Sequence, residues 1–302
     1  MYKIVHLVPY DGIGGVETAA KTMMHVYDGN IDFEVKYIFD SKNKSRKQII
    51  KSTYNPIKLL SAALGFRKNT VDVLIVSLWR SLIVGVLVKI FRPKIKLVTF
   101  LHLAKHAHCI DAICNSVALP LSSQIWADSE ATRKGRLSFS KQRQCHVISF
   151  VTKKIEPLPL KTVAPVFIFW GRITTQKGLG RAILIFSEIH KQYRHAKFLV
   201  VGPYDNDAVK IKKLCASMGL EESVVFNGSA TFEEIINYAG PASFYLQTSI
   251  IEGMAMSVVE SMQLGLVPIV TPVGEIRNYC QDGHNAVIVE TDKRSIRNDS
   301  VI

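Results

Sequence analysis

Two glutamates, Glu252 and Glu260, lie eight residues apart in the stretch SIIEGMAMSVVESMQLG (249–265). Glu252 and Gly253 fall between a strand-like run and a helix-like run, and a carboxylate there can accept hydrogen bonds from sugar hydroxyls. Backbone N–H groups at the start of the following helix, near 254–258, can hold phosphate oxygens. One acid for a sugar, one for a ribose and amides for the phosphates between them would form a nucleotide-sugar site.

Glu260 also has a structural interpretation. Ser257-Val258-Val259-Glu260 fits a capping box, in which Ser257 caps the helix and the glutamate reaches back to its N–H. This alternative does not explain Glu252 and Gly253, which lie before the helix.

Two cations follow another strand-like run, in WGRITTQKG (170–178). Arg172 and Lys177 precede the helix-like run LGRAILIFSEI. Arg offers a planar fork and Lys a point charge, so the pair suits a diphosphate beside a helix N-terminus. The alternative is ordinary salt bridging at the surface.

A glycine cluster in VPYDGIGGVETAA (8–20) joins a strand-like run to a helix-like run. Phosphates bind at such turns because bare N–H groups and a helix N-terminus converge there. The dinucleotide fingerprint GxGxxG fails here, because Gly12 and Gly14 are followed by Glu17 at the third glycine position. A phosphate site at Gly14 and Gly15 remains; the alternative is a turn that uses the wide φ range of glycine.

Twelve β-rich runs, six in each half, alternate with helical patterns from KIVHLV (3–8) to NAVIVE (285–290). Strands this apolar imply parallel sheets covered by helices on both faces. The proline-rich segment 152–165 is the predicted linker. We therefore expect an α/β chain of two doubly wound, Rossmann-like domains, 1–155 and 156–302, facing a cleft. Functional residues should follow the carboxyl ends of strands.

The composition is that of a globular protein, with 302 residues, 48% of them hydrophobic and 21% charged. The longest apolar stretch, 81–91, contains Lys89 and is too short to span a bilayer. The N-terminus is predicted to be a strand, not a signal peptide. Five cysteines without a CxxC indicate reduced thiols and a cytoplasmic protein.

Positive charge is concentrated in the first half of the chain. Residues 1–160 contain 24 Lys and Arg against 11 Asp and Glu, whereas residues 161–302 contain 14 of each. This charge favours an anionic partner, such as a membrane surface or a phosphate-bearing acceptor. No groove-reading or base-stacking motif accompanies it, so no nucleic acid is expected. A merely solvated surface is the alternative.

The stretches GGVE, GRITTQKG, EGMAMSVVESMQLGLVPIVTPVGE and DGHNAVIVE, in this order, resemble the retaining glycosyltransferases of family 4, or group 1 glycosyltransferases. That family has the GT-B fold. The resemblance runs to about residue 290 and is strongest over 166–290.

The resemblance implies a role for each matching residue. Those expected at the donor diphosphate are Gly14, Gly15, Arg172, Lys177, Gly253, Ser257 and Val258. Glu252 would contact the donor sugar and Glu260 the nucleotide ribose. His102, which ends the run IKLVTFLH, matches the family's histidine at the cleft and would help position the sugar. Ser129 matches a serine at another strand end.

The implied activity is retaining transfer of a sugar from a nucleotide-diphospho-sugar to a saccharide or lipid-linked acceptor, in surface polysaccharide synthesis such as that of lipopolysaccharide. The protein would be cytoplasmic and could lie peripherally on the inner membrane face. Two alternatives remain: a non-catalytic nucleotide-sugar-binding protein and a GT-B sugar-nucleotide epimerase. Family members usually continue beyond the point where this chain stops, so its C-terminal end is expected to be truncated.

No metal cofactor is expected. Asp205 and Asp207 in YDND (204–207) imitate a metal-binding DxD, but no second carboxylate cluster accompanies them. His102 and His106 have a zinc spacing if that segment is helical, yet no distant ligand pair completes a site.

Overall fold

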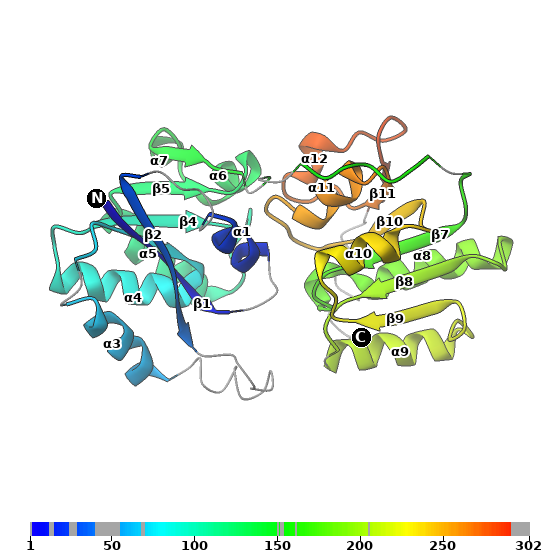
Figure 1. Cartoon of the computed structure of the whole chain (residues 1–302), viewed down its shortest axis with the longest axis horizontal. Helices are drawn as coiled ribbons and strands as arrows, with labels where there is room; N and C mark the ends of the chain where they lie inside the picture. The colour runs from blue at the N-terminus through cyan, green and yellow to red at the C-terminus, as the bar shows by residue number, and fades with distance from the viewer. Residues whose placement is uncertain are drawn as a thin grey trace. The chain divides into compact units, whose positions relative to one another are not determined.

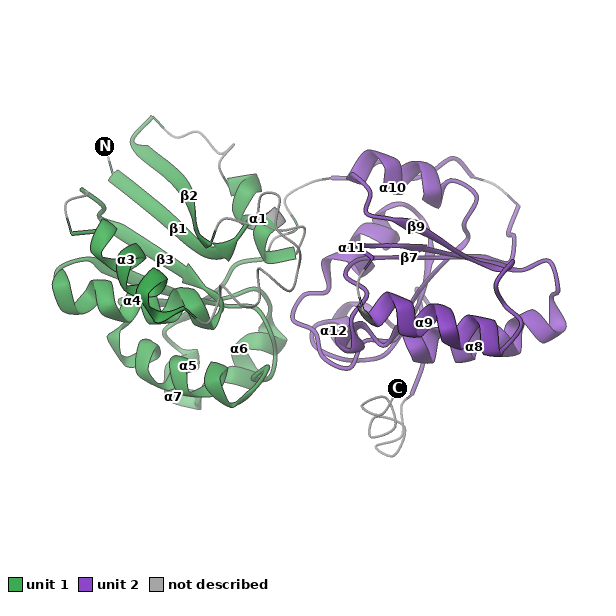
Figure 2. Ribbon diagram, turned by 90° about the horizontal axis from the view of Figure 1, so that it is seen from below, with its two compact units in different colours: residues 1–152 green, residues 153–302 purple. Residues whose placement is uncertain are grey.

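The computed structural model describes residues 2–11, 15–23, 29–39, 55–67, 70–149, 151, 154–160, 162–204 and 206–290, with backbone alone for Thr18, Ala19 and Asn206. The chain divides into two compact units, Met1–Thr152 and Lys153–Ile302 (Figure 2). Each unit is built on one parallel sheet of six strands with helices around it (Figure 1).

The first unit's sheet has the strand order β2-β1-β3-β4-β5-β6. The strands are β1 (Tyr2–Tyr10), β2 (Ile31–Phe39), β3 (Val73–Ser77), β4 (Lys96–Leu101), β5 (Gln124–Ala127) and β6 (Cys145–Val147). The chain moves outward from β1 to β2 and then crosses to β3 on the other side of β1. The sheet therefore has its switch point between β1 and β3, where open α/β sheets bind ligands.

The helices of the first unit are α1 (Gly15–Met23), α3 (Pro56–Gly65), α4 (Leu78–Phe91), α5 (Cys109–Leu121), α6 (Glu130–Arg136) and α7 (Phe139–Gln142). Leu59 of α3 and Val88 of α4 pack with Leu74 of β3 and Leu97 of β4 in one buried apolar cluster. Across the described part of the chain, no helix has both the length and the apolar character needed to cross a membrane.

The second unit's sheet has the order β12-β11-β10-β7-β8-β9. Its strands are β7 (Val166–Trp170), β8 (Lys197–Val201), β9 (Val224–Gly228), β10 (Phe244–Gln247), β11 (Val267–Val270) and β12 (Val287–Ile288). Here the switch point lies between β7 and β10, which pair directly. The loops that leave these two strands must therefore meet at one edge of the sheet.

Helices cover both faces of this sheet. They are η1 (Thr175–Lys177), α8 (Leu179–Gln192), α9 (Asn206–Ser217), α10 (Phe232–Ala239), α11 (Met256–Gln263) and α12 (Ile276–Tyr279). Figure 2 shows α8 and α9 on one side of the strands and α10 and α11 on the other. Phe186 of α8 lies in one apolar core and Val258 of α11 in the other, each with residues of the sheet.

The predicted fold class is confirmed. Each of the twelve β-rich runs forms a strand, and each sheet is parallel with apolar clusters packed against it. Residues buried on both sides, such as Phe169 and Tyr245, explain why these strands are apolar throughout and do not alternate.

Candidate functional site

Glu252 lies in the loop after β10 and is nearly buried, with 5% of its surface exposed. Its Oε1 accepts three hydrogen bonds, from Lys177 Nζ at 2.8 Å, Gln247 Nε2 at 3.2 Å and Ser249 Oγ at 2.7 Å. No described residue donates to Oε2. The carboxylate is thus held through one oxygen, while the other keeps its capacity to accept.

Lys177 ends the η1 turn in the loop after β7, and three further hydrogen bonds join this loop to the Glu252 loop. The Ile250 N–H donates to Gln176 O at 2.8 Å, and Gln176 Nε2 donates to Ile251 O at 3.0 Å. Thr248 Oγ1 donates to the carbonyl of Gly178 at 2.7 Å. The loops after β7 and β10 are therefore connected at four places, counting the ion pair.

Gly178 permits this close approach. It has φ 65°, and a Cβ added to it would lie 1.9 Å from the Thr248 carbonyl oxygen. Any side chain would push the two loops apart and separate Lys177 from Glu252.

Arg172 occupies the same loop but behaves differently. Its side chain is exposed and has no hydrogen-bond or ion-pair partner within the part of the chain that the structure describes. Of the two predicted diphosphate cations, Lys177 is engaged with a carboxylate and Arg172 faces solvent. Whether they bind a diphosphate stays a prediction.

Gln247, which the sequence analysis did not single out, supports Glu252. Tyr245 Oη donates to Gln247 Oε1 at 2.7 Å, and Ser257 Oγ donates to the same oxygen at 2.9 Å. With its oxygen fixed by two donors, the amide must turn its N–H toward Glu252. Burial raises the pKa of Tyr245 well above its ordinary value, so the phenol stays a proton donor.

The start of α11 differs from the capping-box alternative. The helix begins at Met256, and its N-cap is Ala255 in the left-handed region (φ 59°, ψ 63°), with no side-chain cap. Ser257 is not the cap, because its hydroxyl binds Gln247. The Val258 N–H donates to Ala255 O at 3.0 Å, so a phosphate would have to displace that bond. Gly253 accepts at its carbonyl from the Glu275 N–H at 2.9 Å.

Glu260 lies on α11, and its Oε2 accepts a hydrogen bond from Trp170 Nε1 at 2.9 Å. This contact replaces the reach back to Ser257 that the capping box would require. Trp170 ends β7, so the indole connects the β7 end to α11 and orients the carboxylate. One feature of the sequence indicates this contact: Trp170 is an aromatic residue directly before the loop 171–178, which carries Arg172 and Lys177 and is called the cation loop below.

In the first unit, His102 follows β4 and is nearly buried, with 8% of its surface exposed. Its Nε2 lies 2.8 Å from Ser77 Oγ, and His6 Nε2 lies 2.8 Å from the same oxygen. Burial lowers the pKa of His6 to about 4, and burial followed by repulsion from His6 and Arg136 holds the pKa of His102 well below its usual range. With pKa values lowered in this way, both imidazole rings are neutral at pH 7. The sequence analysis missed His6, although a histidine inside the apolar run KIVHLV is itself a signal.

Ser129 is the N-cap of α6. Its Oγ accepts from the Thr132 N–H at 3.2 Å and donates to Asp128 Oδ1 at 2.9 Å. Gly15 begins α1 and is exposed, as an anion site at a helix start would require. Gly14 lies outside the described residues.

The segment 102–108 is not helical, so the zinc spacing of His102 and His106 does not arise. His106 Nδ1 instead lies 3.3 Å from Asp111 Oδ2, and Arg136 pairs with the same carboxylate at 3.2 Å. Among the described residues, no three His, Cys, Asp or Glu side chains lie close enough together to hold a metal ion. Asp205 of the DxD-like pattern is outside the described residues.

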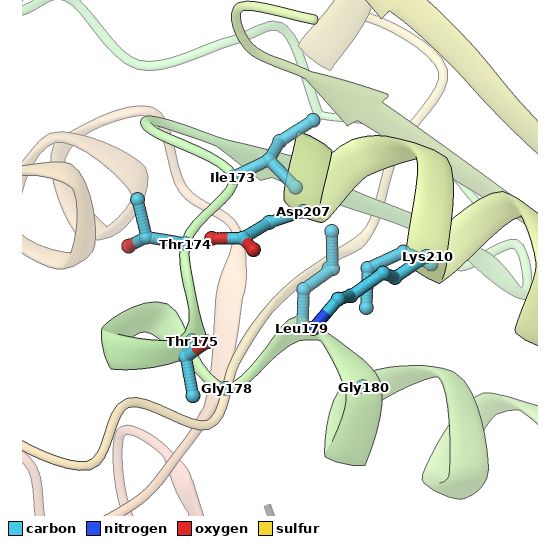
Figure 3. Close-up of a pocket in the computed structure, with 9 residues that line it drawn as sticks. Ile173, Thr174, Thr175, Gly178, Leu179, Gly180, Asp207 and Lys210 are labelled. Atoms are coloured by element: carbon cyan, nitrogen blue, oxygen red, sulfur yellow. The ribbon is translucent and has the colours of Figure 1, made fainter. Parts of the chain in front are cut away.

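A shallow hollow borders the cation loop on the side of α9. Its lining includes Thr174 and Thr175 of the loop and Asp207 and Lys210 of α9 (Figure 3). Ile173 of the loop and, at the start of α8, Leu179 and Gly180 also line it. The loop that holds Lys177 against Glu252 on one side is therefore open to solvent on the other.

Two doubly wound sheets define the fold class, and solved structures of glycosyltransferases share it. Anabaena HepE in complex with UDP and glucose superposes with a TM-score of 0.74 at 15% identity, over 100% of this chain and 89% of that one. The apo form of the lipopolysaccharide outer core galactosyltransferase WaaB gives a TM-score of 0.64 at 16% identity, over 99% and 88%. The fold is GT-B.

Residues 150–297 match the family model described as glycosyl transferases group 1. This match covers the second unit almost completely, including the loops that carry Lys177 and Glu252.

The curated relatives share the same half. One is a GDP-mannose:cellobiosyl-diphosphopolyprenol alpha-mannosyltransferase of Xanthomonas oryzae, 26% identical over 141 residues, which are 46% of this chain and 37% of the relative. Another is the alpha-monoglucosyldiacylglycerol synthase of Streptococcus pneumoniae, 27% identical over 97 residues, or 32% of this chain and 21% of the relative. The matched stretches thus span less than two fifths of these relatives.

Proposed function

We propose that this protein transfers a sugar, with retention, from a nucleotide-diphospho-sugar to a saccharide or lipid-linked acceptor. The single observation that carries the proposal is the state of Glu252. Three donors hold its Oε1, whereas Oε2 accepts from no described residue. Oε2 is not sealed from solvent, so a sugar hydroxyl can reach this oxygen and donate to it.

The diphosphate of the donor would bind next to this carboxylate. Lys177 touches Glu252 and Arg172 projects from the same loop, so the two cations can meet the phosphate oxygens while the sugar meets Oε2. Negative charge builds on those oxygens as the glycosidic bond breaks, and fixed cations and N–H dipoles stabilise it without reorganising. Gly253 and Ser257 would add amides from the second unit, and Gly14 and Gly15 from the first.

Glu260, oriented by Trp170, would accept hydrogen bonds from the ribose hydroxyls. His102 would donate to the donor sugar from the first unit. The transition state is oxocarbenium-like, as in glycoside hydrolysis. The leaving phosphate takes the proton of the acceptor hydroxyl, so no protein nucleophile is needed. A relative named an alpha-mannosyltransferase supports an α-linked product, which is retention when the donor is α-linked.

The acceptor is proposed from two observations. One relative's name specifies a cellobiosyl-diphosphopolyprenol, and another's specifies a monoglucosyldiacylglycerol as the product. The excess of positive charge in residues 1–160 would attract an anionic surface or a phosphate group. We therefore place the reaction at the inner face of a membrane, in the synthesis of a surface polysaccharide or glycolipid.

The proposal is tested by thermal shift with UDP-, GDP-, ADP- and dTDP-sugars and with NAD. A ligand that binds only the folded state raises the melting temperature. We expect one nucleotide-sugar class to do so, with loss of the shift in Lys177→Ala and not in Lys191→Ala. Lys191 is the matched control, because its ion pair with Glu188 is exposed and lies at the end of α8 away from the loop that carries Lys177. No shift with any nucleotide-sugar, in a folded sample, would overturn the proposal.

Product analysis then separates the activities. Transfer should require an added acceptor, such as a lipid-linked saccharide, and should give an α-linked product. Conversion of the donor without any acceptor would identify an epimerase instead, and donor binding without turnover would identify a binding protein.

A further inference from the structure

Three helices of the first unit, α3, α4 and α5, pack together, with α4 in contact with both of the others (Figure 1). Their inner sides belong to one apolar core, through Leu59 and Ala63 of α3, Val88 of α4 and Ala118 of α5. A helix at the surface of a globular protein normally carries charged and polar side chains on its other side. The outer sides of these three helices are apolar instead.

The large apolar side chains that have at least 39% of their surface exposed are Ile57, Leu60 and Leu64 of α3, Ile90 and Phe91 of α4, and Ile110, Ile113, Val117 and Leu121 of α5. Their spacing of three or four residues in α3 and α5 places them on one side of each helix. The exposed fractions of Ile57, Ile90 and Ile113 reach 74%, 64% and 63%. We name these nine residues the apolar face.

The helices of the second unit lack such a face. Among the described residues of α8 to α12, only Leu184 and Val209 are exposed to a similar degree. The outer side of α8 ends instead in the exposed ion pair of Glu188 and Lys191. Single exposed apolar residues are ordinary, whereas a group of them on adjacent helices marks an interaction site.

The exposed charges of the three helices are all basic. Lys58 belongs to α3, Arg80 and Lys89 to α4, and Asp111 to α5. Asp111 is the single acidic residue of these helices, all of which the structure describes, and it is buried and paired with Arg136 at 3.2 Å. An anionic partner would therefore meet no acidic side chain on the three helices.

Further basic residues border the apolar face where α3 and α4 end. The Arg92 guanidinium donates to the Phe66 carbonyl at 3.2 Å, which joins the end of α4 to the end of α3. Lys94 follows in the same loop and Lys96 begins β4, and both are exposed. Asp72 is the one acidic residue in the segments 66–72 and 92–96, and its carboxylate accepts from the Lys3 N–H. The net charge of this border is positive.

We propose that the apolar face and its basic border form a docking surface, through which α3, α4 and α5 lie on an anionic lipid bilayer. The apolar side chains would enter the boundary between headgroups and acyl chains, and the lysines would stay at the level of the phosphates. A bilayer offers hydrocarbon and negative charge together. A second copy of this chain fits this surface less well, because a symmetric contact would bring two basic borders together.

α5 connects the docking surface to the candidate site. This helix begins at Cys109, directly after the segment 102–108 that starts with His102. The Ile110 end of the apolar face therefore lies at the carboxyl edge of the sheet, as His102 does. The role of the surface rests on the proposed function, since a lipid-linked acceptor in the same bilayer would present its saccharide near this edge.

Vesicle sedimentation of the full chain tests the inference. We expect binding to vesicles of phosphatidylglycerol and phosphatidylcholine that weakens with salt, and little binding to phosphatidylcholine alone. The double variant Ile113→Ser/Val117→Ser should raise the apparent Kd for the mixed vesicles about tenfold or more. The matched control Leu184→Ser/Val209→Ser, on α8 and α9, should leave it unchanged. Absence of binding by the wild type at low salt, or equal binding by both double variants, would overturn the inference.

A tryptophan placed on the apolar face reads the contact directly. In difference spectra against the wild type, the emission of Ile113→Trp should shift to shorter wavelength when the mixed vesicles are added, because the indole leaves water. Leu184→Trp should show no shift. The same response at both positions would contradict docking through this face.

Two further measurements separate the remaining outcomes. A dimer found by sedimentation equilibrium without lipid, and lost in Ile113→Ser/Val117→Ser, would assign the face to a second copy and overturn membrane docking. Vesicle binding without a thermal shift by any nucleotide-sugar would leave the docking surface intact and count against the proposed function. A thermal shift without vesicle binding would do the reverse.

Discussion

Lys177 Nζ and Glu252 Oε1 form an ion pair at 2.8 Å, with 14% and 7% of the two side chains exposed. The cation predicted for the diphosphate and the carboxylate predicted for the sugar are therefore partners before any donor binds. An arriving diphosphate must share or take Lys177, which leaves Glu252 held by Gln247 and Ser249.

Removing the cation should destabilise the fold. Lys177→Met leaves a buried carboxylate with two neutral donors, and breaking a buried pair costs about 3–5 kcal/mol when no other donor remains. With Gln247 and Ser249 in place, we expect a loss of about 1–3 kcal/mol in the free energy of unfolding, measured by urea denaturation. Lys191→Met, in an exposed pair, should change it little. Equal effects in both variants would mean that the Lys177 pair contributes no more than a surface contact.

Glu252→Gln should separate sugar contact from nucleotide binding. The glutamine oxygen can still accept from Ser249 and Lys177, but the open Oε2 becomes an NH₂ group that cannot accept from a hydroxyl. We expect kcat/KM for transfer to fall by about 100-fold or more, with little change in the Kd of the free nucleoside diphosphate. A parallel loss in both quantities would contradict the sugar-contact role.

Trp170→Phe tests the orientation of Glu260. The variant keeps an aromatic ring but loses the Nε1–H that donates to Glu260 Oε2 at 2.9 Å. The carboxylate should then bind ribose less well, raising the Kd of the nucleoside diphosphate about five- to tenfold, the usual value of one hydrogen bond. Binding of inorganic pyrophosphate is the internal control. If both ligands weaken alike, the tryptophan acts on the cation loop and not on Glu260.

The contact between the loops can be tested at glycine. Gly178 and Gly219 have nearly the same φ, 65° and 66°, but a Cβ on Gly219 meets nothing within 4 Å. Gly219→Ala should cost about 1 kcal/mol, the price of the backbone conformation alone. Gly178→Ala adds the clash with Thr248 O, so we expect a loss of more than about 3 kcal/mol and weaker donor binding. Similar losses in both variants would show that the loops can separate freely.

Stability should fall as the pH drops from about 6.5 to about 4. The folded state holds the pKa of His6 at about 4, against 6.5 ordinarily, so only the unfolded chain gains that proton in this window. Each such histidine lowers the free energy of unfolding by up to about 1.4 kcal/mol per pH unit, and His102 acts in the same direction. Urea denaturation across the window should show a shallower slope in His6→Gln than in the wild type. An unchanged slope would mean that His6 is protonated in the folded state.

The sequence predicted the twelve strands because apolar runs between helical patterns are local features, visible over a few residues. It also predicted that Lys177 and Glu252 each lie in a loop after a strand, as they do, because the end of an apolar run is a local feature too. It did not predict which groups touch. The pairs Lys177–Glu252, Trp170–Glu260 and His6–Ser77 depend on strand order, on which local patterns carry little information.

The capping-box alternative is wrong because tertiary contacts decide the partners of Ser257 and Glu260. Ser257 and Glu260 have the right spacing for it, but Ala255 adopts a left-handed conformation that starts α11 two residues before Ser257 would cap it. Gln247 and Trp170 then offer both side chains partners from strand ends. Tertiary contacts override the local motif here.

The hydrogen bonds between the site loops also determine when the site can form. Thr248 and Gly178 are 70 positions apart, Lys177 and Glu252 are 75, and Trp170 and Glu260 are 90. Such non-local contacts form late in folding, because the chain first loses entropy when the long intervening segment is closed into a loop. On the ribosome, the cation loop is synthesised well before its carboxylate partner. We therefore expect the nucleotide-sugar donor to bind only after the second unit has folded completely. A folding intermediate in which β10 has not yet formed should not bind the donor.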